Sequence, residues 1–193
     1  MLFHKGKATT SISIDGSFSG NTGSGAIMDI NDIIDQDTGN AILVLTENEY
    51  NIRKKIKEFP TIKNIAYIDN LRGELDLTIN KKHITTEPTP YKLFRGRNIG
   101  YYRIIDLPDK EYVDPEFVKH TAKQKYIFEQ RLICQQIVNM AKKRRISFAL
   151  APENSVLGNS CNFISLKPND DDVDIYFLLG VLNSSLIDWY FKL

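Results

Sequence analysis

The stretch from residue 131 to residue 164 constrains the fold more than any other part of the chain. It contains three apolar runs, of which the first, residues 132–138, mixes amides with β-branched residues. In the second run Ile146, Phe148 and Leu150 alternate with smaller side chains, which is the spacing of a strand with one buried face. The stretch therefore predicts strands of a sheet.

Amides and cations share this stretch. Gln135, Gln136 and Asn139 lie along the first run and just after it, and a basic cluster follows at residues 142–145. A sheet edge that carries amides beside cations offers groups that read base edges and groups that grip phosphates. Amides buried in a sheet would instead have to be hydrogen-bonded within the protein.

The charged residues are segregated along the chain. Residues 91–145 carry 13 basic and 6 acidic residues, although the net charge of the whole chain is only +1. Both flanks are acidic, with 10 basic and 12 acidic residues over 1–90, and 2 basic and 6 acidic residues over 146–193. A basic middle suggests one face suited to a polyanion. The alternative is a set of solvated, lysine-rich helix faces.

The length of 193 residues suits one domain, or a core domain with an appendage. No apolar run approaches the roughly 20 residues that span a bilayer, and the N-terminus lacks the apolar segment of a secretory signal. Two cysteines are too few for a disulfide framework. These features predict a cytoplasmic protein without a membrane partner.

Local signals predict the secondary structure before residue 60. Thr46 and Glu49 form a capping-box pattern for a helix that runs to Phe59 and is closed by a proline. The apolar stripe expected on that helix is Tyr50, Ile52, Ile56 and Phe59. Short strands are expected at 8–15 and 41–45, and a flexible glycine-rich loop at 16–25.

Helix signals are also present in the second half of the chain. Asp114 followed by Pro115 is typical of a helix start and predicts a helix that runs to about Gln130. A closing helix is expected over 175–191, broken near residues 183–185. The predicted fold class is therefore α+β, with a mixed, mostly antiparallel curved sheet, a middle helix and a C-terminal helical hairpin or broken helix.

The sequence contains no complete catalytic constellation. Gly23 and Gly25 follow a predicted strand, but Met28 stands where the last glycine of a dinucleotide fingerprint would be. No Glu-x-Lys of a nuclease is present, and His4, His83 and His120 lack metal-ligand spacing. We therefore expect neither catalytic nor metal-binding residues in this chain.

The turn at residues 95–98 is a stronger candidate for binding. Gly96 separates Arg95 from Arg97, and Asn98 follows. An arginine can pair bidentately with guanine or clamp a phosphate, and an asparagine can pair with adenine. The alternative is a surface turn whose arginines are bonded to nearby carboxylates.

Five short blocks together resemble a known family. The blocks are RGELDL (72–77), LFRGRNIGYY (93–102), RLICQQIVN (131–139), KRRISFALAPENSVLGNSCNFI (143–164) and YFLLGVLNSSLIDWYF (176–191). They are similar to the C-terminal target-recognition, or specificity, domain of bacterial type II restriction-modification N6-adenine DNA methyltransferases. The similarity is to the TaqI-like domains, and especially to the Alw26I/Eco31I/Esp3I group. It covers residues 65–193, and residues 1–64 are interpreted as the portion that leads into the domain.

The resemblance implies an α+β domain that binds double-stranded DNA beside a methyltransferase catalytic domain, in cis or in trans. That catalytic domain would bind S-adenosylmethionine, flip the target adenine and transfer the methyl group, and a fused nuclease could add cleavage. Because this chain has neither the cofactor loop nor the Asn/Asp-Pro-Pro-Tyr/Phe motif, it is expected to bind no cofactor and to have no activity alone. The predicted DNA-binding residues are Arg72, Arg95, Arg97, Asn98, Tyr101, Tyr102, Gln135, Gln136, Asn139, Lys142, Lys143, Arg144, Arg145, Asn159 and Asn162.

Three other functions are compatible with parts of the sequence. One is half of a type I specificity subunit, although no sustained heptad repeat of its spacer appears. Another is a small nuclease or nucleotide-binding enzyme that uses the Gly16–Gly25 loop. The third is a plain interaction module.

Overall fold

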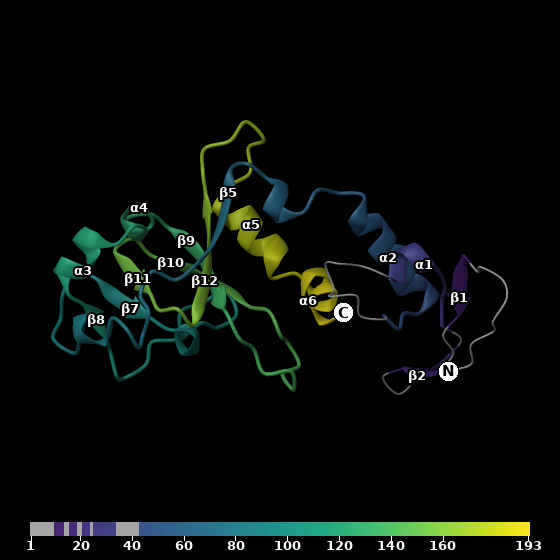
Figure 1. Cartoon of the computed structure of the whole chain (residues 1–193), viewed down its shortest axis with the longest axis horizontal. Helices are drawn as coiled ribbons and strands as arrows, with labels where there is room; N and C mark the ends of the chain where they lie inside the picture. The colour runs from purple at the N-terminus through teal and green to yellow at the C-terminus, as the bar shows by residue number, and fades with distance from the viewer. Residues whose placement is uncertain (1–9, 14–15, 19–20, 24, 34–42) are drawn as a thin grey trace. The chain divides into compact units, whose positions relative to one another are not determined.

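The chain divides into two compact units, residues 1–60 with Leu193 and residues 61–192. The computed structural model describes residues 10–13, 16–18, 21–23, 25–33 and 43–193 (Figure 1). The division at residue 60 is defined by contacts within the chain. The boundary after residue 64 in the sequence analysis is defined by family resemblance, so it stays a prediction.

The described residues of the first unit form two strand pairs and two helices. Its elements are β1 (Ser11–Ser13), β2 (Gly16–Phe18), β3 (Asn21–Gly23), β4 (Ile27–Asp29), α1 (Ile30–Ile33) and α2 (Glu47–Lys57). β1 pairs with β4 and β2 with β3, both antiparallel. The expected flexible loop at 16–25 therefore contains a two-stranded hairpin. The strand expected at 8–15 is found at 11–13, and its remaining residues except Thr10 lie outside the described part.

Helix α2 begins as the capping box predicts. Thr46 Oγ1 accepts a hydrogen bond from the Glu49 backbone N–H at 3.4 Å, and Glu49 Oε2 accepts one from the Thr46 backbone N–H at 2.9 Å. The two bonds satisfy N–H groups that have no partner inside the helix. The helix ends at Lys57, which is earlier than the predicted Phe59.

The buried face of α2 differs from the predicted apolar stripe. Tyr50 is buried as expected, but Ile52 and Phe59 are 41% and 72% exposed, and Arg53 is only 1% exposed. Arg53 is buried because its guanidinium donates to the backbone carbonyl of Asp32 at 3.1 Å, while the Tyr50 hydroxyl donates to the Asp32 carboxylate at 2.5 Å. Polar contacts with α1 thus set the orientation of α2.

The strand predicted at 41–45 is wrong for residues 43–45, which adopt no regular secondary structure; residues 41 and 42 lie outside the described part. Leu43 and Leu45 are nevertheless buried, and the Leu45 carbonyl accepts a hydrogen bond from the Ala26 backbone N–H at 2.9 Å. The apolar run indicated burial correctly and the strand incorrectly.

Two four-stranded sheets organise the second unit. The first is antiparallel and has the order β10 (Phe148–Ala151), β9 (Arg131–Gln135), β12 (Cys161–Leu166) and β5 (Ile68–Arg72). The second has the order β11 (Ser155–Leu157), β7 (Lys92–Phe94), β8 (Tyr112–Val113) and β6 (Ile84–Thr85). In the second sheet β11 and β7 are parallel and the other pairs are antiparallel. The three apolar runs predicted between residues 131 and 164 each contain a strand, but the first strand ends at Gln135 instead of Val138 and the second begins at Phe148 instead of Ile146.

The alternation along β9 buries both faces of the first sheet. Ile133 packs with Phe163 and Leu157 on the face towards the second sheet. Leu132 packs on the other face against Leu178 of helix α5 (Ile175–Leu182), which runs beside these strands in Figure 1. The first sheet therefore lies between the second sheet and α5.

The helices of the second unit are shorter than predicted in one place. Asp114 caps α3 (Pro115–His120) by accepting from the Glu116 N–H at 2.8 Å, as predicted. The predicted continuation to about Gln130 is wrong, because Thr121 is extended and α4 (Gln124–Ile127) starts separately. The remaining short helices are η2 (Ile62–Asn64), η3 (Lys81–His83) and η4 (Gly96–Asn98).

The C-terminal helix is broken at the predicted place. α5 ends at Leu182, and α6 (Ser185–Lys192) follows. Strands and helices alternate irregularly along the chain, and the pairing within sheets is mostly antiparallel. The α+β fold with a C-terminal helical pair is confirmed.

A buried ion pair joins the two sheets. The Arg131 guanidinium of β9 bonds to the Glu74 carboxylate, and neither side chain has any exposed surface. Arg131 also donates to the Ser155 carbonyl at 2.6 Å, and Glu74 accepts from the Leu157 N–H at 2.8 Å. Burial lowers the pKa of Arg131, and the charge of Glu74 opposes that effect. The pair thus connects β9 to both ends of β11.

Candidate nucleic-acid interface

The segment between β9 and β10, residues 136–147, carries the basic cluster and is called the basic loop here. Lys142 and Lys143 are exposed, and Arg144 and Arg145 are half-buried. Within the described residues, no carboxylate lies in ion-pair range of these four side chains. Their charges are therefore available to an external anion.

Asn183, at the break between α5 and α6, anchors the end of the basic loop. Its side chain is fully buried, and its amide donates to the Phe148 carbonyl at 2.9 Å and accepts from the Phe148 N–H at 2.8 Å. Its own backbone carbonyl accepts from Arg144 Nη1 at 3.1 Å. The break in the helix thus positions a polar residue to hold the strand that follows the loop.

Asp188 of α6 holds the loop at a second point. Its Oδ1 accepts from the backbone N–H groups of Arg145 at 2.8 Å and Ile146 at 3.1 Å. Its Oδ2 accepts from Lys192 Nζ at 2.6 Å, and the same ammonium donates to the Lys143 carbonyl at 2.6 Å. The two helices therefore fix the backbone of the basic cluster, while the charged ends of Lys142, Lys143 and Arg145 form no hydrogen bond within the described residues.

The environment of Asp188 gives the anchor a pH dependence. Burial alone would raise the pKa of this carboxyl, but hydrogen bonds from Lys192, Ile146 and Arg145 outweigh burial and lower the pKa from 3.8 to about 2. A carboxylate with a lowered pKa stabilises the folded state above its unfolded pKa, and this contribution disappears as the pH falls through the folded pKa. The contribution of Asp188 is therefore complete above about pH 4 and is lost between about pH 4 and pH 2.

We expect Asp188→Asn to lower the free energy of unfolding by about 2 kcal/mol at pH 6, since hydrogen bonds to a charged group are lost. The difference between variant and parent should shrink as the pH falls from 4 to 2. Urea unfolding at a series of pH values measures it, with the exposed Asp170→Asn as control. A difference that stays constant down to pH 2 would contradict the assigned role.

Two tyrosines lie against the basic loop. Arg144 Cζ is 4.3 Å from the centre of the Tyr101 ring, and the Tyr101 hydroxyl donates to the Asn183 carbonyl at 3.2 Å. The ring of Tyr102 packs edge-on against Tyr101 with centroids 4.5 Å apart, and its φ of 61° is unusual for a bulky residue. Both rings are nearly half exposed, so they present an aromatic surface beside the cations.

The turn at residues 95–98 is internally paired. Arg95 donates to Glu111 through Nε at 2.6 Å and Nη2 at 2.5 Å, and Arg97 Nη2 lies 2.6 Å from Asp109 Oδ2. This is the arrangement that the alternative interpretation of the turn describes. The carboxylates already neutralise both arginines of this turn, whereas the cations of the basic loop have no such partners among the described residues.

Several of the predicted base-reading amides bond within the protein. The Asn98 side chain accepts from the Arg95 N–H at 2.9 Å and donates to the Ile105 carbonyl at 3.2 Å. Gln135 donates to the Gly96 carbonyl at 2.6 Å, and Asn159 donates to Asp76 at 2.8 Å. These amides hold turns in place.

The remaining predicted polar residues form fewer hydrogen bonds within the described part of the protein. The side chains of Gln136 and Asn162 form no hydrogen bond within the described part of the chain, and Gln136 is exposed. Asn139 is exposed and accepts from the Ala141 N–H at 2.9 Å. Arg72 is exposed and donates to the Asn159 carbonyl at 2.9 Å. Gln136, Asn139 and Asn162 therefore keep donors that can reach a ligand.

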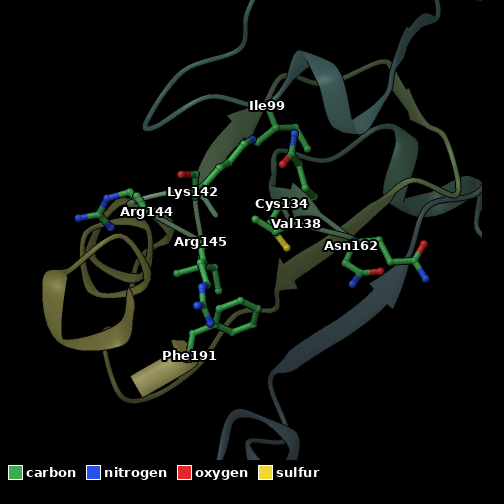
Figure 2. A pocket seen from close by; sticks show the side chains of 12 residues that line it. Ile99, Cys134, Val138, Lys142, Arg144, Arg145, Asn162 and Phe191 are labelled. Atoms are coloured by element: carbon green, nitrogen blue, oxygen red, sulfur yellow. The ribbon is translucent and has the colours of Figure 1, made fainter. Parts of the chain in front are cut away.

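A pocket of about 130 Å³ lies between the basic loop, the sheet and α6. We call it the loop pocket. Figure 2 shows the Arg145 side chain beside the ring of Phe191, with Asn162 across the pocket and Arg144 turned away. The lining residues are Ile99, Cys134, Gln135, Gln136, Val138, Lys142, Arg144, Arg145, Ile146, Ser147, Asn162 and Phe191. A second, more open groove adjoins it across Gln135 and is lined by Arg95, Arg97 and Ile137 among others.

Comparison with protein families identifies the chain. A model of the TaqI-like C-terminal specificity domain matches residues 91–193, which is more than half of the sequence. The chain belongs to this family. The match spans the basic loop, both tyrosines and the C-terminal helical pair, and it supports DNA recognition for a methyltransferase rather than catalysis. The comparison with curated proteins gives no match.

The structure of this specificity domain adds residues that sequence reasoning did not find. Asn183 and Asp188 anchor the basic loop, and Glu111 and Asp109 neutralise the turn at 95–98. The sequence carried a signal for Asn183, which interrupts an apolar helical pattern, because an asparagine among apolar residues needs a hydrogen-bond partner if it becomes buried. Over the described residues, no cluster of three metal-ligating side chains occurs and no helix is long and apolar enough to cross a membrane.

Proposed function

We propose that the chain selects the DNA sequence on which an N6-adenine DNA methyltransferase acts, as part of a bacterial type II restriction-modification system of the Alw26I/Eco31I/Esp3I kind. Methyl transfer, and any cleavage, belongs to a catalytic domain in cis or in trans that binds S-adenosylmethionine. The observation that carries the proposal is the basic loop, whose four cations have no carboxylate partner among the described residues and whose backbone is held by α5 and α6.

The proposed division of roles follows from which groups are free. Lys142 and Lys143 bind phosphates, which fixes the position of the duplex without reading its sequence. The amide of Gln136 and the free amide donor of Asn139, on the same loop, read base edges in the major groove. Tyr101 and Tyr102 lie beside the cations and contact the sugar-phosphate backbone.

Arg95 and Arg97 have a conditional role in this proposal. Each is paired with a carboxylate 2.5–2.6 Å away, so a contact with guanine requires the arginine to leave Glu111 or Asp109. Such an exchange costs part of the binding free energy but strongly disfavours incorrect bases, because an unmatched arginine then returns to its carboxylate. In this proposal four predicted residues hold the neighbouring turns in place through hydrogen bonds within the protein and do not contact bases. They are Arg72, Asn98, Gln135 and Asn159.

Charge removal on the basic loop tests the proposal. In Lys142→Gln with Lys143→Gln, two phosphate contacts are lost, so the affinity for a 30-base-pair duplex should fall roughly thirtyfold at physiological salt. The slope of log K against log salt should become shallower by about 2. Fluorescence anisotropy over a range of salt concentrations measures both.

The matched control is Lys81→Gln with Lys82→Gln, which removes the same charge from the exposed η3 segment. This variant should keep the affinity of the parent within about twofold. Selection from a duplex pool with a randomised core tests sequence choice, and the parent should enrich one motif. Equal losses in the two double variants, or a pool without an enriched motif, would refute the proposed function.

A further inference from the structure

The loop pocket has the composition of an anion site. Lys142, Arg144 and Arg145 contribute cations, whereas Gln136 and Asn162 contribute neutral amides. No aspartate or glutamate lines it. Its volume of about 130 Å³ equals the space of several water molecules, which is enough for a tetrahedral anion with bridging water.

Arg145 is the cation best placed to hold such an anion. Its backbone N–H is fixed by Asp188 at 2.8 Å, so the residue is anchored. Its guanidinium, by contrast, forms no hydrogen bond within the described residues, and its Nε is enclosed without a partner. An enclosed donor without an acceptor costs free energy, and a small rotation towards an anion in the pocket would offset that cost. Arg144 differs, since it is already bonded to the Asn183 carbonyl.

The opposite wall is compatible with an anion. Asn162 projects from β12, half-buried and without a side-chain hydrogen bond in the described part of the chain, so its amide donor is free. Cys134 lies beside it on β9, in register with Asn162. Burial raises the pKa of the Cys134 thiol to about 11, so that the thiol stays uncharged at neutral pH and does not repel an anion.

We infer that the loop pocket is a subsite for one phosphate group, held by Arg145 and Asn162 with Lys142 at the rim. The inference rests on the proposed function in one respect, namely that the phosphate in the cell is a phosphodiester of the bound DNA. The pocket itself would bind either a phosphodiester of DNA or free inorganic phosphate. It would therefore clamp one backbone position beside the bases that the basic loop reads.

The test compares two variants that remove the same charge from the same loop. Arg145→Gln changes the pocket, whereas Lys143→Gln changes an exposed side chain that does not line it. Inorganic phosphate is titrated into each protein and followed by amide chemical shifts in two-dimensional NMR. The parent and Lys143→Gln should bind with affinities within twofold, with shifts centred on residues 134, 145 and 162, whereas Arg145→Gln should bind at least tenfold more weakly.

Asn162→Leu provides a test without any change of charge, and it should weaken phosphate binding severalfold. Thermal unfolding of each variant verifies that the fold is retained, which we expect because neither side chain is hydrogen-bonded in the parent. Equal weakening by Arg145→Gln and Lys143→Gln would overturn the inference, since it would indicate diffuse charge attraction. Binding of adenosine without a phosphate at the same residues would also overturn it.

A duplex arm separates this inference from the proposed function. If the parent binds phosphate as expected but no duplex, the subsite stands and the proposed function fails. A second outcome is that the parent binds a duplex but not inorganic phosphate, and that Arg145→Gln and Lys143→Gln reduce the salt dependence of duplex binding equally. In that case the proposed function stands and the subsite fails. When both hold, phosphate should compete with the duplex in the parent and much less in Arg145→Gln.

Discussion

Replacing Glu74 with glutamine should lower the free energy of unfolding by about 4 kcal/mol, the largest effect expected of any single substitution discussed for this protein. Glutamine keeps the shape of the side chain but removes its charge, so the fully buried guanidinium of Arg131 loses its counter-ion. The hydrogen bond from the Leu157 N–H is weakened at the same time. Urea unfolding followed by circular dichroism measures the change.

Two further variants locate the cause. Glu116→Gln removes an exposed carboxylate that is paired with His120 and Lys119, and it should leave the midpoint of urea unfolding nearly unchanged, because solvent screens exposed ion pairs. Combining Glu74→Gln with Arg131→Met removes both buried charges and should recover part of the loss. If the double variant is as unstable as the sum of its single variants, the cost lies in packing and the ion-pair explanation is wrong.

Replacing Asn183 with alanine should cost about 3 kcal/mol of stability and should loosen the basic loop. The substitution leaves the buried N–H of Phe148 without a partner, which costs about 1–3 kcal/mol, and it removes one of the two hydrogen bonds to the Phe148 carbonyl, which keeps the bond from the Tyr102 N–H at 3.1 Å. Because Phe148 begins the strand that follows the loop, amide hydrogen exchange should accelerate at residues 144–149 before it does so in β12.

Ser185→Ala is the matched control for Asn183→Ala, since Ser185 is exposed and lies only two positions after Asn183. Ser185 is the first residue of α6, and its replacement by alanine should change the stability by less than about 0.5 kcal/mol. Uniform acceleration of exchange across the whole first sheet in Asn183→Ala would mean that this residue supports the fold generally, without a particular role at the loop.

Sequence patterns predicted the parts of the fold that depend on neighbouring residues. The capping box at Thr46 and the helix start at Asp114 rely on contacts within a few positions. The alternation at Phe148 and Leu150 located strand β10, but its implication of one buried face is wrong, because Ala149 between them is buried as well. The orientation of α2 could not be predicted in this way. Arg53 is buried because its partner is a carbonyl 21 residues away, a contact that exists only in the folded chain.

The candidate site illustrates the same limit of local patterns. The arginines at 95 and 97 and the cluster at 142–145 look equally cationic in the sequence. They differ in the fold because Glu111 pairs with Arg95 from 16 residues away, whereas among the described residues no carboxylate pairs with the cationic side chains of the basic loop, and Asp188 bonds to its backbone instead. Which of the predicted amides are free was decided in the same way, since Gln135 bonds to the Gly96 carbonyl 39 residues earlier.

The anchors of the basic loop act on its main chain. Asp188 accepts from the N–H groups of Arg145 and Ile146, and Asn183 bonds to the N–H and carbonyl of Phe148. Main-chain groups are the same in every residue except proline, so the side chains of the loop could be exchanged without releasing the clamp. Natural variation or engineering of residues 136–143 would then change the recognised DNA sequence without changing the scaffold. Variants with different sequence specificities should therefore have nearly the same free energy of unfolding.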